Sequence, residues 1–287
     1  MLEGWTLKQI LWSLRKAQLP ISNNWSVLDI GSGSNPHPAA DVLLEKYIDQ
    51  AHRYRPLVAD RPTVLGDACR MPFRDKAFDF AIASHVLEHI SEPAAFLNEL
   101  QRVARAGYIE TPNALFERLV PYDVHLLEIV NINEMLIIHK KQSAKPDRFL
   151  NELSLTVASP KWRRFFYGNP ELFHVRYLWK DNIRFKILNP EISLDWFKGP
   201  DIHEIINNEI AARPSIKNLR SLGLSMLRWW YQIRKKRKID LIEFLACPDC
   251  HGELAYNTEF LFCSSCEVYY STQPLVDFNN PVRGYNQ

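Results

Sequence analysis

The sequence has no apolar run long enough to cross a bilayer, and Glu3 interrupts the start where a secretory signal would need apolar residues. It also lacks a large excess of one charge, because its net charge is only +2. Such a charge gives no overall field that would demand a nucleic-acid partner. Repeats and low-complexity tracts are missing as well. With 46% hydrophobic and 24% charged residues, the 287-residue chain predicts a globular, cytoplasmic protein with a larger and a smaller domain.

The glycine-rich turn near the N-terminus lacks a third glycine. Residues 27–33 read Val-Leu-Asp-Ile-Gly-Ser-Gly, which predicts a buried parallel strand followed by a tight turn at Gly31 and Gly33, where a ligand can approach the backbone. The dinucleotide fingerprint G-x-G-x-x-G needs its last glycine where this chain has Pro36. NAD is therefore disfavoured, and a smaller adenosyl ligand fits better.

Further strands and a helix follow the turn in alternation. The pattern predicts strands at 40–45, 63–68, 78–84 and 107–111, and a helix after Ser91 with Leu97, Leu100 and Val103 on one face. Glu45 ends the second strand, where a carboxylate can accept both ribose hydroxyls, and Asp67 ends the third, where it can accept an adenine amino proton. Such alternation predicts an α/β fold with a parallel sheet and a ligand at the carboxyl ends of its strands.

The motifs VLDIGSG, GDACRMPF and SHVLEHI, in this order within residues 25–113, resemble the small-molecule branch of the class I S-adenosylmethionine-dependent methyltransferases. The resemblance implies a Rossmann-like, mostly parallel seven-stranded sheet and S-adenosyl-L-methionine as cofactor. It implies cofactor binding by Asp29, Gly31, Ser32, Gly33, Glu45, Asp67, Ala68 and Ser84. Only 11 residues separate Gly33 from Glu45, so the first crossover helix should be short or missing, and Asp49 is a rival ribose ligand.

His85-Val-Leu-Glu88-His89 also spells the H-x-x-E-H pattern of a class of zinc metalloproteases. In that interpretation both histidines bind metal and Glu88 activates water. The pattern, however, directly follows a buried strand, where methyltransferases carry the same residues. His89 is better explained as part of a helix start. His85 is the first candidate for a catalytic residue that touches the substrate, and Glu110 and His125 are the other titratable groups expected near the same sheet edge.

Four of the five cysteines form two C-x-x-C pairs that are separated by twelve residues. Two such pairs can supply four thiolates to one tetrahedral zinc, which favours a structural zinc ion over a disulfide in a cytoplasmic protein. The predicted ligands are Cys247, Cys250, Cys263 and Cys266. With four thiolates the zinc keeps no position for water, so it should hold the fold rather than do chemistry. Cys69 stands apart and is expected to be a small apolar residue.

The sequence around these cysteines, with Ile242–Cys250, Leu261–Cys263 and Pro274–Phe278, resembles a family of small zinc-ribbon proteins. Eukaryotic and archaeal members of that family are the activating subunits of tRNA, rRNA and release-factor methyltransferases. The resemblance covers about residues 240–279. It implies that a methyltransferase and its activating partner are joined in one chain, so that the ribbon acts in cis.

We therefore expect a methyltransferase domain at 1–216, with its core motifs at 25–113 and a cap or strand-hairpin region at 114–216. A basic amphipathic linker helix should follow at 217–240, and the zinc ribbon at 241–287. Hairpins are predicted across residues 131–134 and 180–182, and the second is favoured to supply the last two strands of the methyltransferase sheet. Residues 221–239 can pack between the domains, lie on an anionic membrane as a peripheral contact, or bind RNA.

The chain also lacks the Asn/Asp-Pro-Pro-Tyr turn that enzymes methylating amide or adenine nitrogens usually carry after the fourth strand, and has Ser84-His85-Val86-Leu87 there. A hydroxyl, carboxyl or carbon acceptor is therefore favoured. The first hypothesis is methyl transfer to a small molecule, sugar or lipid-linked glycan. A tRNA or rRNA methyltransferase and a non-catalytic cofactor-binding scaffold are the alternatives.

Overall fold

The structure, a computed structural model, describes residues 12, 14–48, 56–143, 148–157, 159–194, 196 and 239–283. The chain divides into two compact units. The first comprises Met1–Pro20, Ser84–Ala94 and Tyr108–Pro200, and the second Ile21–Ala83, Ala95–Gly107 and Asp201–Gln287. Among the described residues, no helix combines the length and the apolar character needed to cross a membrane.

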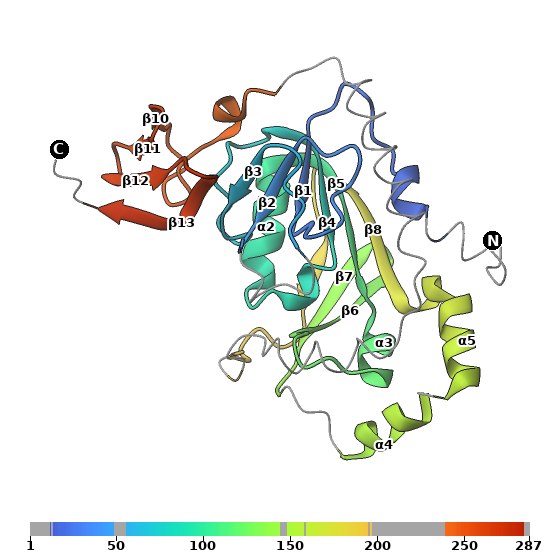
Figure 1. Cartoon of the computed structure of the whole chain (residues 1–287). Coiled ribbons are helices and arrows are strands. Elements are labelled where there is room, and N and C mark those ends of the chain that lie inside the picture. The colour runs from blue at the N-terminus through green and yellow to red at the C-terminus, as the bar shows by residue number, and fades with distance from the viewer. Residues whose placement is uncertain are drawn as a thin grey trace. The chain divides into compact units, whose positions relative to one another are not determined.

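The second unit is built around the predicted parallel strands. Strand β1 (Val27–Ile30) pairs in parallel with β2 (Val42–Glu45) on one side and with β4 (Phe78–Ser84) on the other, and β2 pairs in parallel with β3 (Thr63–Leu65). The strand order is β3-β2-β1-β4-β5, with β5 at Ala104–Pro112 (Figure 1). Strands β2 and β3 are added on one side of β1 and β4 and β5 on the other, so the direction of strand addition reverses at β1. Ligands of such sheets bind at that turning point, beyond the carboxyl ends of the strands. The five strands expected from the sequence are confirmed.

Within the described residues, few helices connect these strands. The described residues 31–41, between β1 and β2, form turns and no helix, as the short spacing predicts. Helix α2 (Pro93–Val103) precedes β5, and its Leu97, Leu100 and Val103 are fully buried, which confirms the predicted apolar face.

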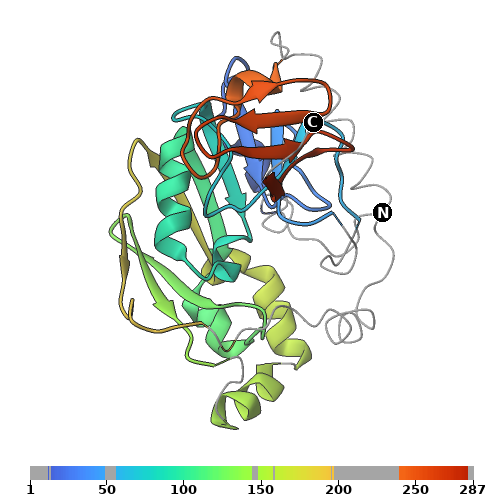
Figure 2. The same ribbon diagram turned by 90° about the vertical axis from the view of Figure 1, so that its left-hand side faces the viewer.

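The C-terminal cysteine-rich segment extends the same sheet. Its strands β10 (Ala255–Tyr256), β11 (Phe260–Cys263), β12 (Val268–Ser271) and β13 (Val276–Arg283) pair antiparallel in sequence order. Strand β13 then pairs in parallel with β3, with Val276 opposite Val64 and Asp277 opposite Leu65 (Figure 1). Figure 2, turned by 90°, shows these strands facing the viewer. Together with β8 (His174–Lys180), which lies beyond β5, the sheet has ten strands of mixed direction, which corrects the expected mostly parallel, seven-stranded sheet.

The first unit contains a separate three-stranded sheet. Strands β6 (Leu127–Ile132) and β7 (Met135–Lys140) form the first predicted hairpin, whose two turn residues, Asn133 and Glu134, both have positive φ. Strand β9 (Phe185–Ile187) pairs in parallel with β7. The other elements are α3 (Ala114–Leu119), α4 (Arg148–Val157) and α5 (Pro160–Gly168) with the 3₁₀ turns η1 (Arg15–Gln18), η3 (Leu87–His89) and η4 (Pro170–Phe173).

The second predicted hairpin is wrong in its pairing. Strand β8 (His174–Lys180) lies next to β5 in the large sheet, as one of the two expected additional strands. Its intended partner β9 pairs with β7 instead, and only an isolated bridge joins Lys180 to Asn182. Leu136 and Ile138 of β7 are fully buried and stand opposite Phe185 and Ile187 in the parallel register. Phe185 and Ile187 are half-buried beside this apolar strand, and this contact favours the pairing of β9 with β7.

Candidate functional site

The glycine turn after β1 is held by the carboxylate that ends β2. Gly31 and Gly33 have φ angles of 61° and 57°, a conformation that favours glycine, and the Gly31 amide donates to the Leu44 carbonyl at 2.8 Å. Glu45 is buried, and its Oε1 accepts hydrogen bonds from Ser32 Oγ and the Gly33 amide, each at 2.8 Å. Four predicted cofactor residues thus lie together at the sheet edge, with one oxygen of Glu45 fixing the turn.

Asp29, within β1, also acts on the backbone after the turn. Its buried Oδ2 accepts a hydrogen bond from the His37 amide at 2.7 Å, and the Ala39 amide donates to His37 Nδ1 at 3.1 Å. Both bonds lie in the segment that replaces the missing crossover helix. Asp49, the rival for the ribose, is outside the described residues.

Asp67 occupies the corresponding place after β3. Its Oδ1 accepts a hydrogen bond from the Cys69 amide at 2.7 Å, and its Oδ2 lies 3.1 Å from Lys46 Nζ. Burial works to raise the pKa of Asp67, but the Cys69 amide and the Lys46 charge outweigh it and lower the pKa below its ordinary value. Asp67 is therefore an anion and a hydrogen-bond acceptor at neutral pH. Ala68 follows it directly, and Cys69 is partly exposed.

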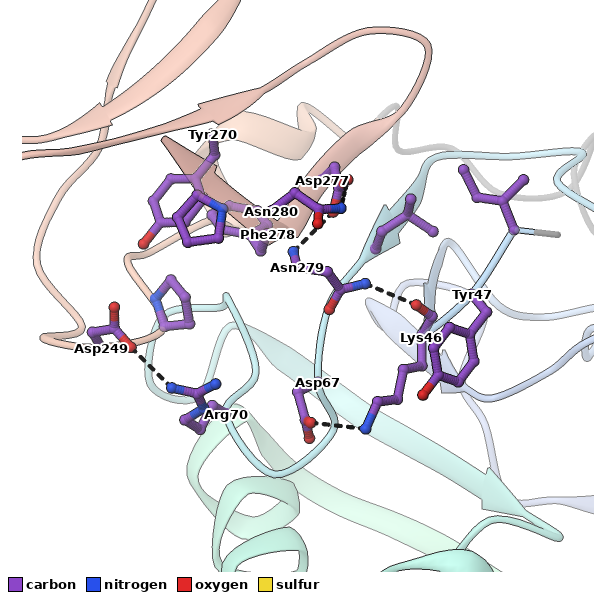
Figure 3. A pocket seen from close by; sticks show the side chains of 14 residues that line it. Lys46, Tyr47, Asp67, Arg70, Asp249, Tyr270, Asp277, Phe278, Asn279 and Asn280 are labelled. Atoms are coloured by element: carbon purple, nitrogen blue, oxygen red, sulfur yellow. Dashed lines mark hydrogen bonds and ion pairs between the residues drawn. The ribbon is translucent and has the colours of Figure 1, made fainter. Parts of the chain in front are cut away.

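A cavity of about 690 Å³ opens beside Asp67 (Figure 3). Lys46, Tyr47 and Arg70 line it from the loops after β2 and β3, and Tyr270, Phe278 and Asn279 line it from the cysteine-rich segment. Hydrogen bonds join its two walls, since Asn279 Nδ2 donates to the Lys46 carbonyl at 2.8 Å and Arg70 approaches Asp249 at 3.3 Å. Its size, its aromatic rings and its mixed charges suit a small polar ligand with a flat ring.

In the first unit, His85 follows β4 in a strained conformation between two buried carboxylates. Its φ is 58°, and its amide donates to the Glu110 carbonyl at 2.7 Å. The imidazole Nδ1 lies 3.2 Å from Glu88 Oε1, and Nε2 lies 3.4 Å from Glu110 Oε1. Burial opposes protonation, but the bonds to Glu110 and Glu88 prevail and raise the pKa of His85 to about 9. His85 is therefore an imidazolium at neutral pH, and it is no base until that proton leaves.

Glu110 of β5 is the centre of this carboxylate cluster. It is fully buried and accepts hydrogen bonds from Arg15 Nε at 2.7 Å, from Tyr108 Oη at 2.6 Å and from Ser84 Oγ at 3.2 Å. Burial alone would raise the pKa of Glu110, yet the bonds from His85 and Arg15 lower it far below its ordinary value. Sequence reasoning missed Arg15 and Tyr108. The alternation Tyr108-Ile-Glu110 within a strand places both side chains on one face, but no pattern links Arg15 to them.

The structure does not support the metalloprotease arrangement of the H-x-x-E-H motif. His85 lies outside any helix, and only Leu87–His89 form a 3₁₀ turn, so His85 and His89 do not share one α-helical face. Both ring nitrogens of His85 are engaged by carboxylates. His89 lies in the short helical turn that the sequence suggested.

The four cysteines of the C-x-x-C pairs come together in the second unit, with all four Sγ atoms within 4.8 Å of one another. Cys250 and Cys263 are 3.4 Å apart at Sγ, and Cys247 and Cys266 are 3.9 Å apart, far longer than a disulfide bond. A tetrahedral zinc with bonds of about 2.3 Å sets its sulfur atoms about 3.8 Å apart. The Gly252 amide also donates to Cys250 Sγ at 3.4 Å. The donors and their spacing fit a closed, structural zinc site.

Residues 221–239, predicted to meet the protein core, a membrane or RNA, fall outside the described residues, apart from residue 239. Before Pro20 the structure describes residues 12 and 14–19, and these contain the 3₁₀ turn η1, which carries Arg15.

Comparisons with known proteins identify the central segment. Residues 28–109, less than a third of the chain, match the family model described as a methyltransferase domain, and this match implies S-adenosylmethionine as cofactor. Ajmaline N-methyltransferase of Rauvolfia serpentina is 42% identical over 43 residues, which are 15% of this chain and 15% of that protein.

Solved structures with similarity include the PH0226 protein of Pyrococcus horikoshii and the YcgJ protein of Bacillus subtilis. The first is 14% identical, and the match covers 51% of this chain and 77% of the PH0226 chain, with a TM-score of 0.30. The second is 16% identical and covers 42% of this chain and 69% of its own, with a TM-score of 0.32.

Proposed function

We propose that this chain transfers a methyl group from S-adenosylmethionine to a hydroxyl, carboxyl or carbon acceptor on a small molecule, sugar or lipid-linked glycan. The observation that carries the proposal is the edge of the parallel sheet within the methyltransferase domain. There the glycine turn, Glu45 and Asp67 follow three successive strands, where a parallel sheet of this order binds its ligand.

Each of these groups has a role in holding the cofactor. Gly31 and Gly33 leave room for a ligand against the backbone, and Glu45 has the acceptor oxygens that a ribose diol needs. Asp67 is anionic and faces the cavity, where it can accept a proton from the adenine amino group. We assign the adenine ring of the cofactor to this cavity, with Tyr47 as an aromatic neighbour (Figure 3).

The cofactor supplies an already activated methyl group, so the protein contributes mainly position and exclusion of water. A base is needed only when the acceptor must lose a proton. Glu88 and Glu110 engage both ring nitrogens of the His85 imidazolium, so His85 offers no N–H group to an anionic acceptor while these contacts last. For a hydroxyl acceptor His85 would serve as a base only after giving up that proton, near pH 9.

We further propose that the cysteine-rich segment stabilises the methyltransferase domain in cis. The turn η6 (Leu241–Phe244) leads from this segment to the core, where the Phe244 ring lies 5.1 Å from that of Phe78. The Arg74 amide donates to the Phe244 carbonyl at 2.9 Å, and the Ala246 amide donates to the Pro72 carbonyl at 3.1 Å. Because the described loops between β1 and β2 and between β3 and β4 contain no helix, this segment covers apolar surface that a crossover helix would otherwise cover.

Radioactive S-adenosylmethionine added to a cell extract with the purified chain tests the proposal. Label is expected in the small-molecule or glycan fraction, and Asp67→Ala should lower its incorporation. The curated relative bears the name of an N-methyltransferase, so labelled products should be tested for methyl on nitrogen as well as on oxygen. Label confined to RNA or to protein, or no label in any fraction, would contradict the proposed acceptor class.

A further inference from the structure

The first unit contains a second group of potential metal ligands, unrelated to the cysteines. Glu88, His89 and His125 each offer one ligand atom, and these three atoms lie within 4.8 Å of one another. The Leu126 amide donates to the Glu88 carbonyl at 2.7 Å, which fixes the chain before β6 against the turn η3. The two imidazole rings meet edge to face, with centroids 4.7 Å apart.

Both histidines are held by a contact of Nδ1. His89 Nδ1 lies 2.9 Å from the Val124 carbonyl, and His125 Nδ1 contacts the buried carboxylate of Glu117. A carbonyl can only accept, and an ionised carboxylate can only accept, so each Nδ1 carries the proton. Each Nε2 is then left with a lone pair. Histidines that bind metals nearly always donate their other N–H to a carboxylate or a backbone carbonyl in this way.

Glu117 and Glu88 are themselves held by further contacts. Lys141 Nζ lies 2.8 Å from the second oxygen of Glu117, which neutralises that buried charge. Glu88 is buried, and its Oε2 accepts a hydrogen bond from Thr111 Oγ1 at 2.9 Å. Its other oxygen, Oε1, lies 3.2 Å from His85 Nδ1. A carboxylate oxygen can accept more than one bond, so Glu88 can bind a cation while it keeps both partners. His89 is exposed, which opens the group to solvent.

We propose that Glu88, His89 and His125 form a binding site for one divalent transition-metal ion, such as Zn²⁺ or Fe²⁺. Two imidazole nitrogens and one carboxylate oxygen suit these ions and not Mg²⁺ or Ca²⁺, which prefer oxygen ligands alone. Three protein ligands leave at least one position for water or an oxygen-containing ligand. A metal with bonds of about 2.1 Å would draw the three donors to roughly 3–3.5 Å from one another, a small contraction of the present arrangement.

The site predicts a second metal ion per chain, beyond the one at the cysteines. The full chain is dialysed against buffered Zn²⁺, and its metal content is measured by inductively coupled plasma mass spectrometry. Wild type should hold two ions and His89→Ala one, because His89 is exposed and its removal leaves the fold in place. The matched control is His139→Ala, which removes another histidine paired with a glutamate, at 3.1 Å from Glu128. It should keep two ions.

Two further variants separate ligand loss from misfolding. Glu117→Gln keeps the shape of the group that orients His125, and it should weaken Zn²⁺ binding at this site about 10- to 100-fold. His125→Ala should abolish the site, with the melting temperature recorded to show that the chain is folded. With Co²⁺ in place of Zn²⁺, the thiolate absorption should be equal in wild type and all variants. The weaker bands of the nitrogen and oxygen site should disappear in His89→Ala and His125→Ala and persist in His139→Ala. One ion in wild type, or two in both His89→Ala and Glu117→Gln with unchanged affinity, would overturn the proposal.

Discussion

Replacing Phe244 with alanine tests whether the cysteine-rich segment is part of the core of the second unit. Phe244 is 5% exposed, and its ring packs against Phe78, which itself packs edge to face on Phe73 at 5.0 Å. Loss of a buried phenylalanine side chain costs about 3–5 kcal/mol, the transfer free energy plus that of the cavity left behind. For a unit of this size the melting temperature should fall by roughly 6–20 °C.

The assay is thermal and urea unfolding, followed both by intrinsic fluorescence and by release of zinc to a colorimetric chelator. Both signals should shift together in Phe244→Ala, because the segment and the core unfold as one unit. The control is Tyr256→Ala, since Tyr256 is 54% exposed on β10 and its loss should change stability by at most about 0.5 kcal/mol. If zinc release moves while the unfolding of the core does not, the segment is an independent module and the reasoning fails.

Three further predictions concern the metal and the charged groups. Cys247→Ser with Cys250→Ser should abolish zinc binding by the ribbon, lower the melting temperature of the whole protein and weaken S-adenosylmethionine binding in calorimetry; unchanged cofactor affinity would contradict stabilisation in cis. Because the pKa of His85 is raised in the folded protein, its charged form stabilises the fold. This stabilisation is complete at pH values below the ordinary pKa of 6.5 and is lost as the pH rises through about 9. The difference in unfolding free energy between wild type and His85→Gln should therefore shrink between about pH 6 and pH 10 in urea titrations, and a constant difference would refute the assignment. Glu110→Gln should destabilise the protein by more than about 1 kcal/mol, because it weakens charged hydrogen bonds to Arg15 and His85, and equal urea midpoints would count against this cluster.

The parts of the fold that sequence could predict are those with a strong local pattern. Strand β1 reads as a continuous apolar run before a glycine turn, and the two C-x-x-C pairs specify their own geometry, so both were found correctly. The hairpin of β6 and β7 was found because two runs rich in apolar residues flank a short turn. These signals lie within a few residues of each other in the chain.

Long-range pairing left no such signal. Nothing in Val276–Arg283 shows that this strand would pair with Thr63–Leu65, because any exposed strand edge can accept a strand of compatible register. The same limit explains β9, which leaves β8 for the edge of β7. It also explains Arg15, whose bond to Glu110 spans 95 residues of chain.

Isothermal titration calorimetry with S-adenosylmethionine tests the central claim most directly. We expect the full chain to bind S-adenosylmethionine and to show no binding of NAD. Asp67→Ala should weaken that binding by about 1–3 kcal/mol, roughly 5- to 150-fold, because an adenine donor would lose its acceptor. Asp123→Ala, at an exposed position in the other unit, should bind like wild type. Binding of NAD in place of S-adenosylmethionine, or equal affinity in Asp67→Ala and wild type, would contradict the account.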